Sequence, residues 1–199
     1  MKDIEDISED QMVATFLKGE ITSPKFGKCI LDKLKSDGRS RAIVDRPNNA
    51  DASENLYRKE LLGHCRGFGM NTQLFEGFPK SVKWKRIEFD IDDLQKIKYL
   101  NYFGWVNISG GTRVVADGAK RIAEGKSGVD KTPFRNLVEA INRGESFQEP
   151  ILVTGNGTDF IVLEGNHRFT SFLMIGGGMP KTITAIVGFS DEMNAWRYY

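Results

Sequence analysis

Phe160-Ile-Val-Leu-Glu-Gly-Asn-His-Arg-Phe-Thr-Ser-Phe-Leu-Met174 is the most informative stretch of the sequence. It opens with an apolar run that predicts a buried strand ending at Glu164. Gly165 permits a tight turn, and the apolar side chains after it recur at helical spacing. The start of such a helix presents free backbone N–H groups and the positive end of the helix dipole, which attract phosphate. The stretch therefore predicts a strand, a phosphate-binding turn and a helix.

Polar side chains at this turn suit the same ligand. Arg168 can hold two phosphate oxygens at once, and His167 can donate a hydrogen bond or transfer a proton. Glu164 can accept a hydroxyl proton or hold Mg²⁺. The predicted catalytic residues are Glu164 and His167, and the predicted phosphate-binding residues are Gly165, Asn166, His167, Arg168, Thr170 and Ser171.

Each of these residues also has a purely structural interpretation. Glu164 and Arg168 are four positions apart, and an ion pair at that spacing supports the start of a helix. Gly165-Asn166 would then be an ordinary turn, and His167 a partly buried histidine. The hairpin predicted before the turn and the helix predicted after it favour the ligand-binding interpretation.

A second glycine turn resembles the first in its residue types. It comprises Ser109, Gly110, Gly111, Thr112 and Arg113, and it precedes a helix predicted over Val114 to Glu124. Such a backbone concavity can contact a phosphate or carboxylate group. The alternative is a glycine turn with a surface arginine. If both turns face one pocket, Arg113 and Arg168 would bracket an anionic ligand.

The remaining histidine lies in a glycine-rich stretch, Gly63-His-Cys-Arg-Gly-Phe-Gly69. We expect a loop there, with a substrate-side role for His64 or Arg66 as the alternative. His64 and His167 are far apart in the sequence and no cysteine cluster accompanies them, so a structural zinc site is not expected.

Around the central stretch the sequence predicts a mixed set of elements. Pro150 to Thr154 and Phe160 to Leu163 flank a Gly-Asn-Gly turn and predict a β-hairpin. Ile87, Phe89 and Ile91 alternate with charged residues as in a half-buried strand, and Asp90 or Asp92 can cap the helix that follows. Further elements are a helix from Thr132-Pro133 to Gly144, a helix from His167 to Ile175 broken by Gly176-Gly-Gly, and a strand from Thr182 to Val187.

The first eighty residues predict helices joined by polar loops. The helices are expected at Ser8 to Lys18, Phe26 to Lys35 and Glu54 to Leu62, with loops at Ser36 to Ser53 and Gly63 to Gly77. We therefore expect an α+β protein in which residues 1–82 form a mostly helical extension packed on a core domain of residues 83–199.

Composition limits the classes of protein to consider. Lys and Arg total 28 and Asp and Glu total 27, so the formal net charge of +1 argues against a protein that coats nucleic acid. Hydrophobic residues make up 40%, the proportion of an ordinary globular chain. No apolar run approaches the ~20 residues that cross a bilayer, so no membrane partner is expected.

Cysteine use and the N-terminus bear on the compartment. Cys29 and Cys65 can pair, but the acidic N-terminus lacks the apolar core of an export signal. We therefore expect two reduced, packed thiols in a cytoplasmic protein.

At Leu163-Glu-Gly-Asn-His-Arg-Phe-Thr-Ser171 the chain resembles the ParB/sulfiredoxin superfamily, whose signature is a strand, a Gly-x-His-Arg type turn and a helix. The strand near Arg86 and the helix cap after it are similar to the opening of that fold. The resemblance covers Trp84 to Phe189 and leaves residues 1–81 unmatched. It implies a small mixed sheet with flanking helices, and a nucleotide diphosphate or triphosphate held by the turn.

Two departures from the family's patterns indicate which of its branches this chain does not resemble. Sulfiredoxins place a reactive cysteine where this chain has Asn166, so sulfinic acid repair is not expected. Partition proteins carry a DNA-binding helical region after the motif, and 31 residues follow Arg168 here, so centromere binding is not expected either. Glu164 before the glycine is similar to the branch whose members phosphorylate free serine.

Three hypotheses follow. The first is an enzyme that uses ATP or another nucleotide, with Mg²⁺, to phosphorylate a small polar metabolite in a pocket formed largely by the first eighty residues. The second is a binding module that responds to CTP or ATP without turnover and self-associates, for example as a homodimer. The third is a nuclease or DNA-binding protein, which the near-neutral charge disfavours.

Overall fold

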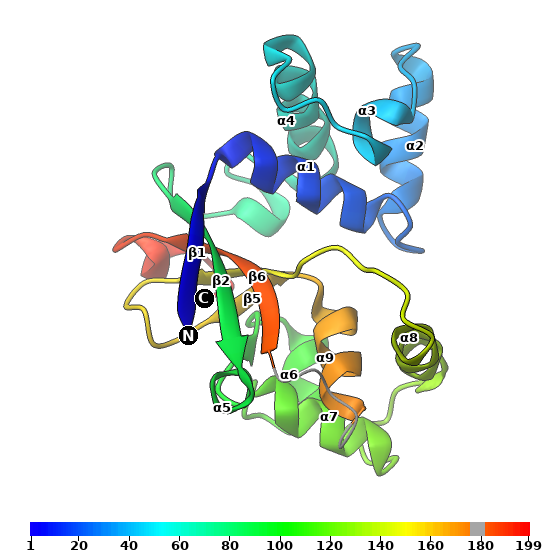
Figure 1. The fold of residues 1–199 in the computed structure, drawn as a ribbon, viewed down its shortest axis with the longest axis vertical. Helices are drawn as coiled ribbons and strands as arrows, with labels where there is room; N and C mark the ends of the chain where they lie inside the picture. Colours follow the sequence, from blue (N-terminus) through cyan, green and yellow to red (C-terminus); the bar gives the residue numbers. More distant parts are fainter. Residues whose placement is uncertain (176–181) are drawn as a thin grey trace.

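The computed structural model describes residues 1–175 and 182–199 and confirms the α+β class (Figure 1). The strands described form one mixed sheet in the order β1-β2-β6-β4-β5-β3. Their bounds are β1 Lys2–Ile7, β2 Lys83–Asp90, β3 Lys98–Tyr99, β4 Ile151–Thr154, β5 Ile161–Glu164 and β6 Thr182–Phe189. β1–β2, β2–β6 and β4–β5 are antiparallel, whereas β3–β5 and β4–β6 are parallel.

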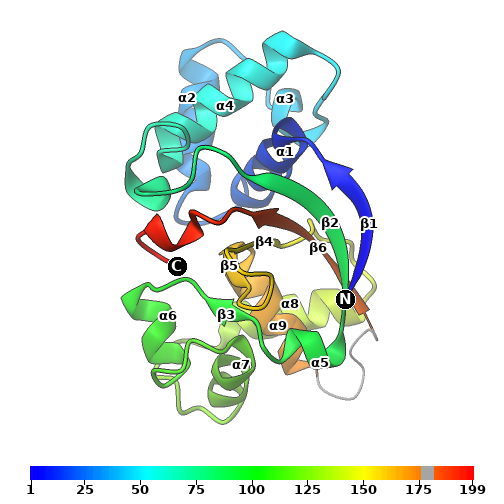
Figure 2. The ribbon, with the colours of Figure 1, turned by 90° about the vertical axis from the view of Figure 1, so that its left-hand side faces the viewer.

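Helices cover both faces of this sheet (Figure 2). One layer contains α1 Glu9–Glu20, α2 Gly27–Ser36, α3 Ala42–Asp45 and α4 Ala52–Arg66, with the 3₁₀ helix η1 Gln73–Phe75 after it. The other side carries α5 Ile91–Leu94, α6 Phe103–Ile108, α7 Val115–Ala123, α8 Thr132–Asn142 and α9 Asn166–Met174. A 3₁₀ helix, η3 Met193–Ala195, lies near the C-terminus.

Alternate residues of the central strands feed two hydrophobic cores. Ile151, Val153 and Ile161 pack in the core that includes Phe16 and Leu62 of the N-terminal helices. Leu152, Val162 and Val187 pack in a second core with Phe134 and Phe169. Because both faces are covered, β4 and β5 read as continuous apolar runs instead of alternating ones. Residues 1–82 thus supply one complete layer of the fold.

Several predicted elements are present with shifted limits. The hairpin, α8, α9 and the capping of α1 by Ser8 agree with the sequence predictions. Asp90 ends β2 and caps α5, so Ile91 begins a helix where we expected the strand to continue. The predicted loop from Ser36 to Ser53 contains α3, and α4 continues to Arg66. Gly176-Gly-Gly lies outside the described residues.

Cys29 and Cys65 form a disulfide, so the prediction of reduced thiols is wrong. α2 and α4 pack against each other and bring the two Cα atoms within 5.9 Å. That proximity is tertiary, because 36 positions separate the cysteines in the sequence. In the part of the chain described, no helix is both long and apolar enough to cross a membrane.

Candidate functional site

The turn between β5 and α9 has the strand-to-helix geometry that its sequence predicts. Gly165 adopts a left-handed conformation with φ +94° and is the N-cap of α9, without a capping side chain. A Cβ atom there would lie 3.2 Å from Cβ of Pro150 and 3.3 Å from its Cα. Helical hydrogen bonding begins with the amide of Phe169, which donates to the carbonyl of Gly165 at 2.8 Å. The amides of residues 166–168 therefore have no hydrogen-bond acceptor within α9.

Glu164 and Arg168 form an ion pair across this turn. Their side chains are 11% and 12% exposed, and Arg168 also donates from Nη1 to the carbonyl of Gln148 at 2.9 Å. Gly19 of α1 lies directly on the pair, where a Cβ atom would approach Nη2 of Arg168 to 2.9 Å. Burial raises the pKa of Glu164, and the positive charge of Arg168 opposes that rise.

His167 occupies the first turn of α9 and reaches solvent. Its ring stacks on Phe134 with centroids 5.0 Å apart and meets Trp105 edge-on, also at 5.0 Å. Burial of the ring between these neighbours lowers the pKa of His167, which favours the neutral imidazole. A neutral, partly accessible imidazole can donate or accept one hydrogen bond.

Thr170 and Ser171 bind other parts of the protein. The Thr170 hydroxyl lies 2.7 Å from the carbonyl of Asn166 and 2.7 Å from the Tyr99 hydroxyl. The Ser171 hydroxyl donates to the carbonyl of Phe134 at 3.2 Å. Both residues are buried, so these hydroxyls fasten α9 to β3 and α8.

Asn166 carries a buried side-chain oxygen, Oδ1, with no hydrogen-bond partner among the described residues. Buried polar atoms without partners are rare in folded proteins. Rotation of the amide by 180° would exchange this acceptor for an N–H donor. In either orientation the atom at this position is shielded from solvent, so Asn166 keeps an unsatisfied polar group inside the turn.

The second glycine turn directs its polar groups into the protein. The Ser109 hydroxyl accepts from the Arg113 amide at 2.9 Å, and the Thr112 hydroxyl accepts from the Val114 amide at 3.2 Å. Arg113 donates from Nε to the carbonyl of Tyr99 at 3.0 Å and from Nη1 to that of Tyr199 at 2.9 Å. The left-handed Gly110 and Gly111 complete the turn. Within residues 1–175 and 182–199, Arg113 and Arg168 share no hydrogen-bond partner. Their predicted joint contact with one anionic ligand remains a hypothesis.

A buried charge cluster adjoins Glu164 from the N-terminal layer. Nη1 of Arg66 lies 3.4 Å from Oε1 of Glu20, and the Arg66 guanidinium stacks 3.6 Å from the centroid of Phe26. Burial raises the pKa of Glu20 to about 8, and the nearby charge of Glu164 adds to the rise while Arg66 opposes it. The sequence analysis named Arg66 as a possible substrate-side residue, as the alternative to an ordinary loop. Nothing in the sequence singled out Glu20.

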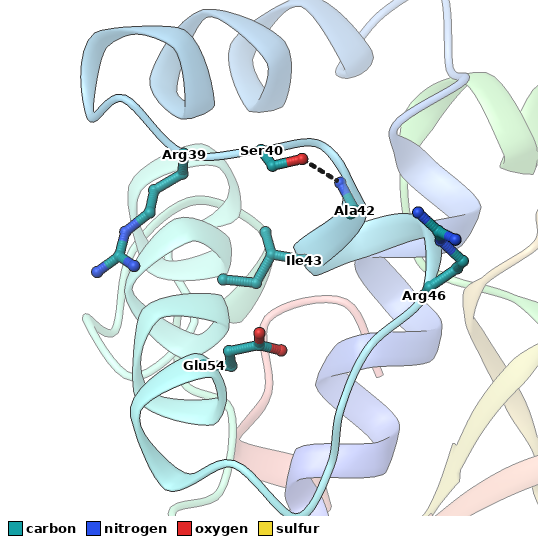
Figure 3. Close-up of a pocket in the computed structure, with 6 residues that line it drawn as sticks. All are labelled: Arg39, Ser40, Ala42, Ile43, Arg46 and Glu54. Atoms are coloured by element: carbon teal, nitrogen blue, oxygen red, sulfur yellow. Dashed lines mark hydrogen bonds between the residues drawn. The ribbon is translucent and has the colours of Figure 1, made fainter.

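Two cavities lie on the N-terminal side of the molecule. One of about 460 Å³ is lined by Arg39, Ser40, Ala42, Ile43, Arg46 and Glu54, with Arg39 and Arg46 at opposite ends (Figure 3). Another of about 170 Å³ lies between α1 and the sheet. Neither is lined by residues of the two glycine turns. Across the described ranges, no three side chains from His, Cys, Asp or Glu gather as a metal site would need.

Comparisons with known proteins do not assign a family to this geometry. No family model, curated protein or solved structure matches the chain.

Proposed function

We propose that the open first turn of α9 binds the phosphate groups of a nucleotide, and that the protein uses this site to phosphorylate a small polar metabolite. The observation that carries the proposal is a helix start with a left-handed glycine, no capping side chain and an accessible histidine beside it. Free amides and the helix dipole favour an anion at such a position. The similarity of Leu163–Ser171 to the ParB/sulfiredoxin superfamily supports the same ligand and a fold of that type.

The residues of the turn fit a phosphate group. The backbone amides of 166–168 and the neutral His167 imidazole supply donors at one place. The guanidinium of Arg168 adds a positive charge at the edge of the turn, and the Arg168 side chain is 12% exposed. When bound, a nucleoside triphosphate supplies the transferable phosphoryl group, and Mg²⁺ bound with it would neutralise phosphate charge.

Glu164 is our candidate for the proton acceptor. Its raised pKa makes it a stronger base than an exposed glutamate. Its carboxylate now pairs with Arg168, so the role requires the guanidinium to turn from Glu164 to phosphate. This exchange would couple occupation of the turn to release of the base. A carboxylate freed in this way could also contact Mg²⁺.

The burial of this ion pair also favours a second candidate, a nucleotide-responsive binding module without turnover. Gly19 of α1 lies directly on the Glu164–Arg168 pair. A rearrangement of this pair would therefore displace α1 and the N-terminal layer. Self-association driven by the nucleotide is the expected consequence of this alternative.

Binding and turnover separate the candidates. Calorimetric titration of the full chain with ATP, ADP and CTP, with and without Mg²⁺, should show saturable binding that His167→Ala weakens at least tenfold. His64→Ala is the matched control, because His64 is exposed on α4. Unchanged affinity in His167→Ala, or equal loss in both variants, would overturn the assignment of the turn.

Glu164→Gln keeps the shape of the side chain and removes the base. Under the first candidate it abolishes formation of ADP from ATP in the presence of acceptor and leaves nucleotide affinity within about threefold. Normal turnover in this variant would exclude Glu164 as the proton acceptor. Binding without turnover in the unmodified protein would select the second candidate.

A further inference from the structure

The larger cavity, here called the arginine pocket, lies within the N-terminal layer (Figure 3). Its volume of about 460 Å³ falls within the ~300–1,000 Å³ that small-molecule sites commonly have. Its walls come from α3, the chain on either side of α3, and the first turn of α4. The lining residues are Arg39, Ser40, Ala42, Ile43, Arg46 and Glu54. The pocket is therefore built from residues 39–54 and is separate from the turn before α9.

Arg39 and Arg46 give this pocket its positive charge. Both are exposed, and they lie at opposite ends of the cavity (Figure 3). The Arg39 guanidinium lies 5.1 Å from the centroid of the Tyr57 ring, a contact that orients the group without neutralising it. The neighbouring Arg41 pairs with Asp45 outside the lining. Within residues 1–175 and 182–199, by contrast, no carboxylate pairs with Arg39 or Arg46.

The acidic residue of the lining, Glu54, is already occupied. Its Oε2 lies 3.1 Å from Nη1 of the fully buried Arg58 and accepts a hydrogen bond from the amide of Asn48 at 3.4 Å. The charge of Arg58 therefore offsets that of Glu54. The charges of Arg39 and Arg46 stay uncompensated, so the pocket attracts anions.

Arg58 also holds the wall of the pocket in place. Its Nη1 donates to the carbonyl of Ile43 at 3.2 Å, and its Nη2 donates to the carbonyl of Asn48 at 3.1 Å. These two carbonyls lie on either side of Arg46 in the sequence. The segment that carries Arg46 is thus fixed before a ligand arrives, which reduces the entropy that binding costs.

The space between the two arginines is partly apolar. Ile43 is buried and lines the cavity together with Ala42, and Figure 3 shows the Ile43 side chain between Arg39 and Arg46. A guanidinium group binds a carboxylate through two parallel hydrogen bonds. One such group at each end, with apolar contact between them, matches a chain of methylene groups that carries a carboxylate at both ends.

We infer that the arginine pocket binds a small aliphatic dicarboxylate, with one carboxylate on Arg39, the other on Arg46 and the methylene chain against Ile43. This site goes beyond the proposed function, since it shares no lining residue with the turn before α9. It gives the protein a second anion site, of a different ligand class from the first.

The test is calorimetric titration of the full chain with adipate and, separately, with hexanoate, which has the same six-carbon chain and one carboxylate. We expect saturable binding of adipate, with hexanoate weaker by about tenfold or more, because one guanidinium then lacks its partner. Arg39→Met and Arg46→Met should each weaken adipate binding by about tenfold. Arg41→Met is the matched control, because Arg41 is an exposed arginine of the same segment that pairs with Asp45 and does not line the pocket. It should leave the affinity unchanged.

Three results would overturn the site: no saturable binding at millimolar adipate, equal binding of hexanoate, or unchanged adipate affinity in either Arg39→Met or Arg46→Met. Both arginines are exposed, so circular dichroism should show that the two variants keep the fold. A titration in the presence of ATP separates this inference from the proposed function. ATP should leave adipate affinity unchanged, and displacement of adipate by ATP would overturn the assignment of two separate sites.

Discussion

The glycine turns at residues 109–113 and 164–168 contain similar residue types and use them differently. In the first turn, hydroxyl groups of Ser109 and Thr112 accept hydrogen bonds from backbone amides, and Arg113 holds carbonyls near the C-terminus. In the second, Gly165 opens α9 without a capping side chain and His167 reaches solvent. The difference teaches that a glycine turn becomes a candidate site only where its backbone amides are not already bound within the protein.

Both turns also place an arginine against internal acceptors, with different consequences. Arg113 contacts backbone oxygens of Tyr99 and Tyr199, so its removal leaves polar groups without a donor. Arg168 contacts a buried carboxylate, so its removal leaves a buried charge. The first loss weakens the fold by a hydrogen-bond deficit, and the second by an electrostatic one.

Arg168→Met should therefore have the largest effect on stability. An uncompensated buried carboxylate costs about 3–5 kcal/mol of unfolding free energy. Denaturant titration at pH 8 measures it, and the double variant Glu164→Gln/Arg168→Met should recover most of the loss. If the double variant is as unstable as the single one, the ion pair does not account for the effect.

Arg113→Met should cost somewhat less, about 2–3 kcal/mol, because three backbone carbonyls lose a charged donor. The same denaturant titration measures it. Calorimetry on this variant should show unchanged ATP affinity, since the first turn is assigned to the fold. A tenfold loss of affinity at full stability would instead place Arg113 in the binding site.

Gly165→Ala and Gly111→Ala form a matched pair with a smaller expected effect. Both glycines have positive φ, 94° and 98°, so alanine costs about 1–2 kcal/mol at either position. At Gly165 the new methyl group also meets Pro150, whereas at Gly111 nothing lies within 4 Å. Thermal unfolding should show the larger loss for Gly165→Ala, and equal losses would refute the close contact with Pro150.

The pH dependence of His167 should be the smallest effect. Burial lowers its pKa below 6.5, so the unfolded chain binds the proton more tightly. The contribution of His167 to stability is complete above pH 6.5 and is lost as the pH falls toward the pKa of the folded state. Because the residue reaches solvent, we expect less than about 1 kcal/mol. NMR titration of the imidazole tests the direction, and bound phosphate should raise this pKa.

The sequence predicted the elements whose signals are local. The β4–β5 hairpin, α8 and the turn into α9 follow from apolar runs, a first-turn proline and glycine positions. β1 was not predicted, because all its side chains but Ile7 are exposed and backbone pairing with β2 holds it in the sheet. β3 has two residues and depends on a parallel neighbour far along the chain.

The features of the candidate site also divide into those with a local sequence signal and those that depend on distant segments. The presence of a strand, a glycine turn and a helix was readable from Phe160–Met174, as was the spacing of Glu164 and Arg168. The rings around His167, the approach of Gly19 and the charge cluster of Glu20 and Arg66 all come from distant segments. Periodicity in one sequence does not encode such contacts, so the surroundings of the turn required the tertiary structure.

Amide chemical shifts test the central claim most directly, because they report on both glycine turns in one sample. On titration of the ¹⁵N-labelled full chain with ATP and Mg²⁺, the amides of residues 166–168 should shift most and saturate together, while those of residues 110–113 stay near their starting positions. Equal shifts at the two turns, or none at residues 166–168 at millimolar ATP, would contradict the account.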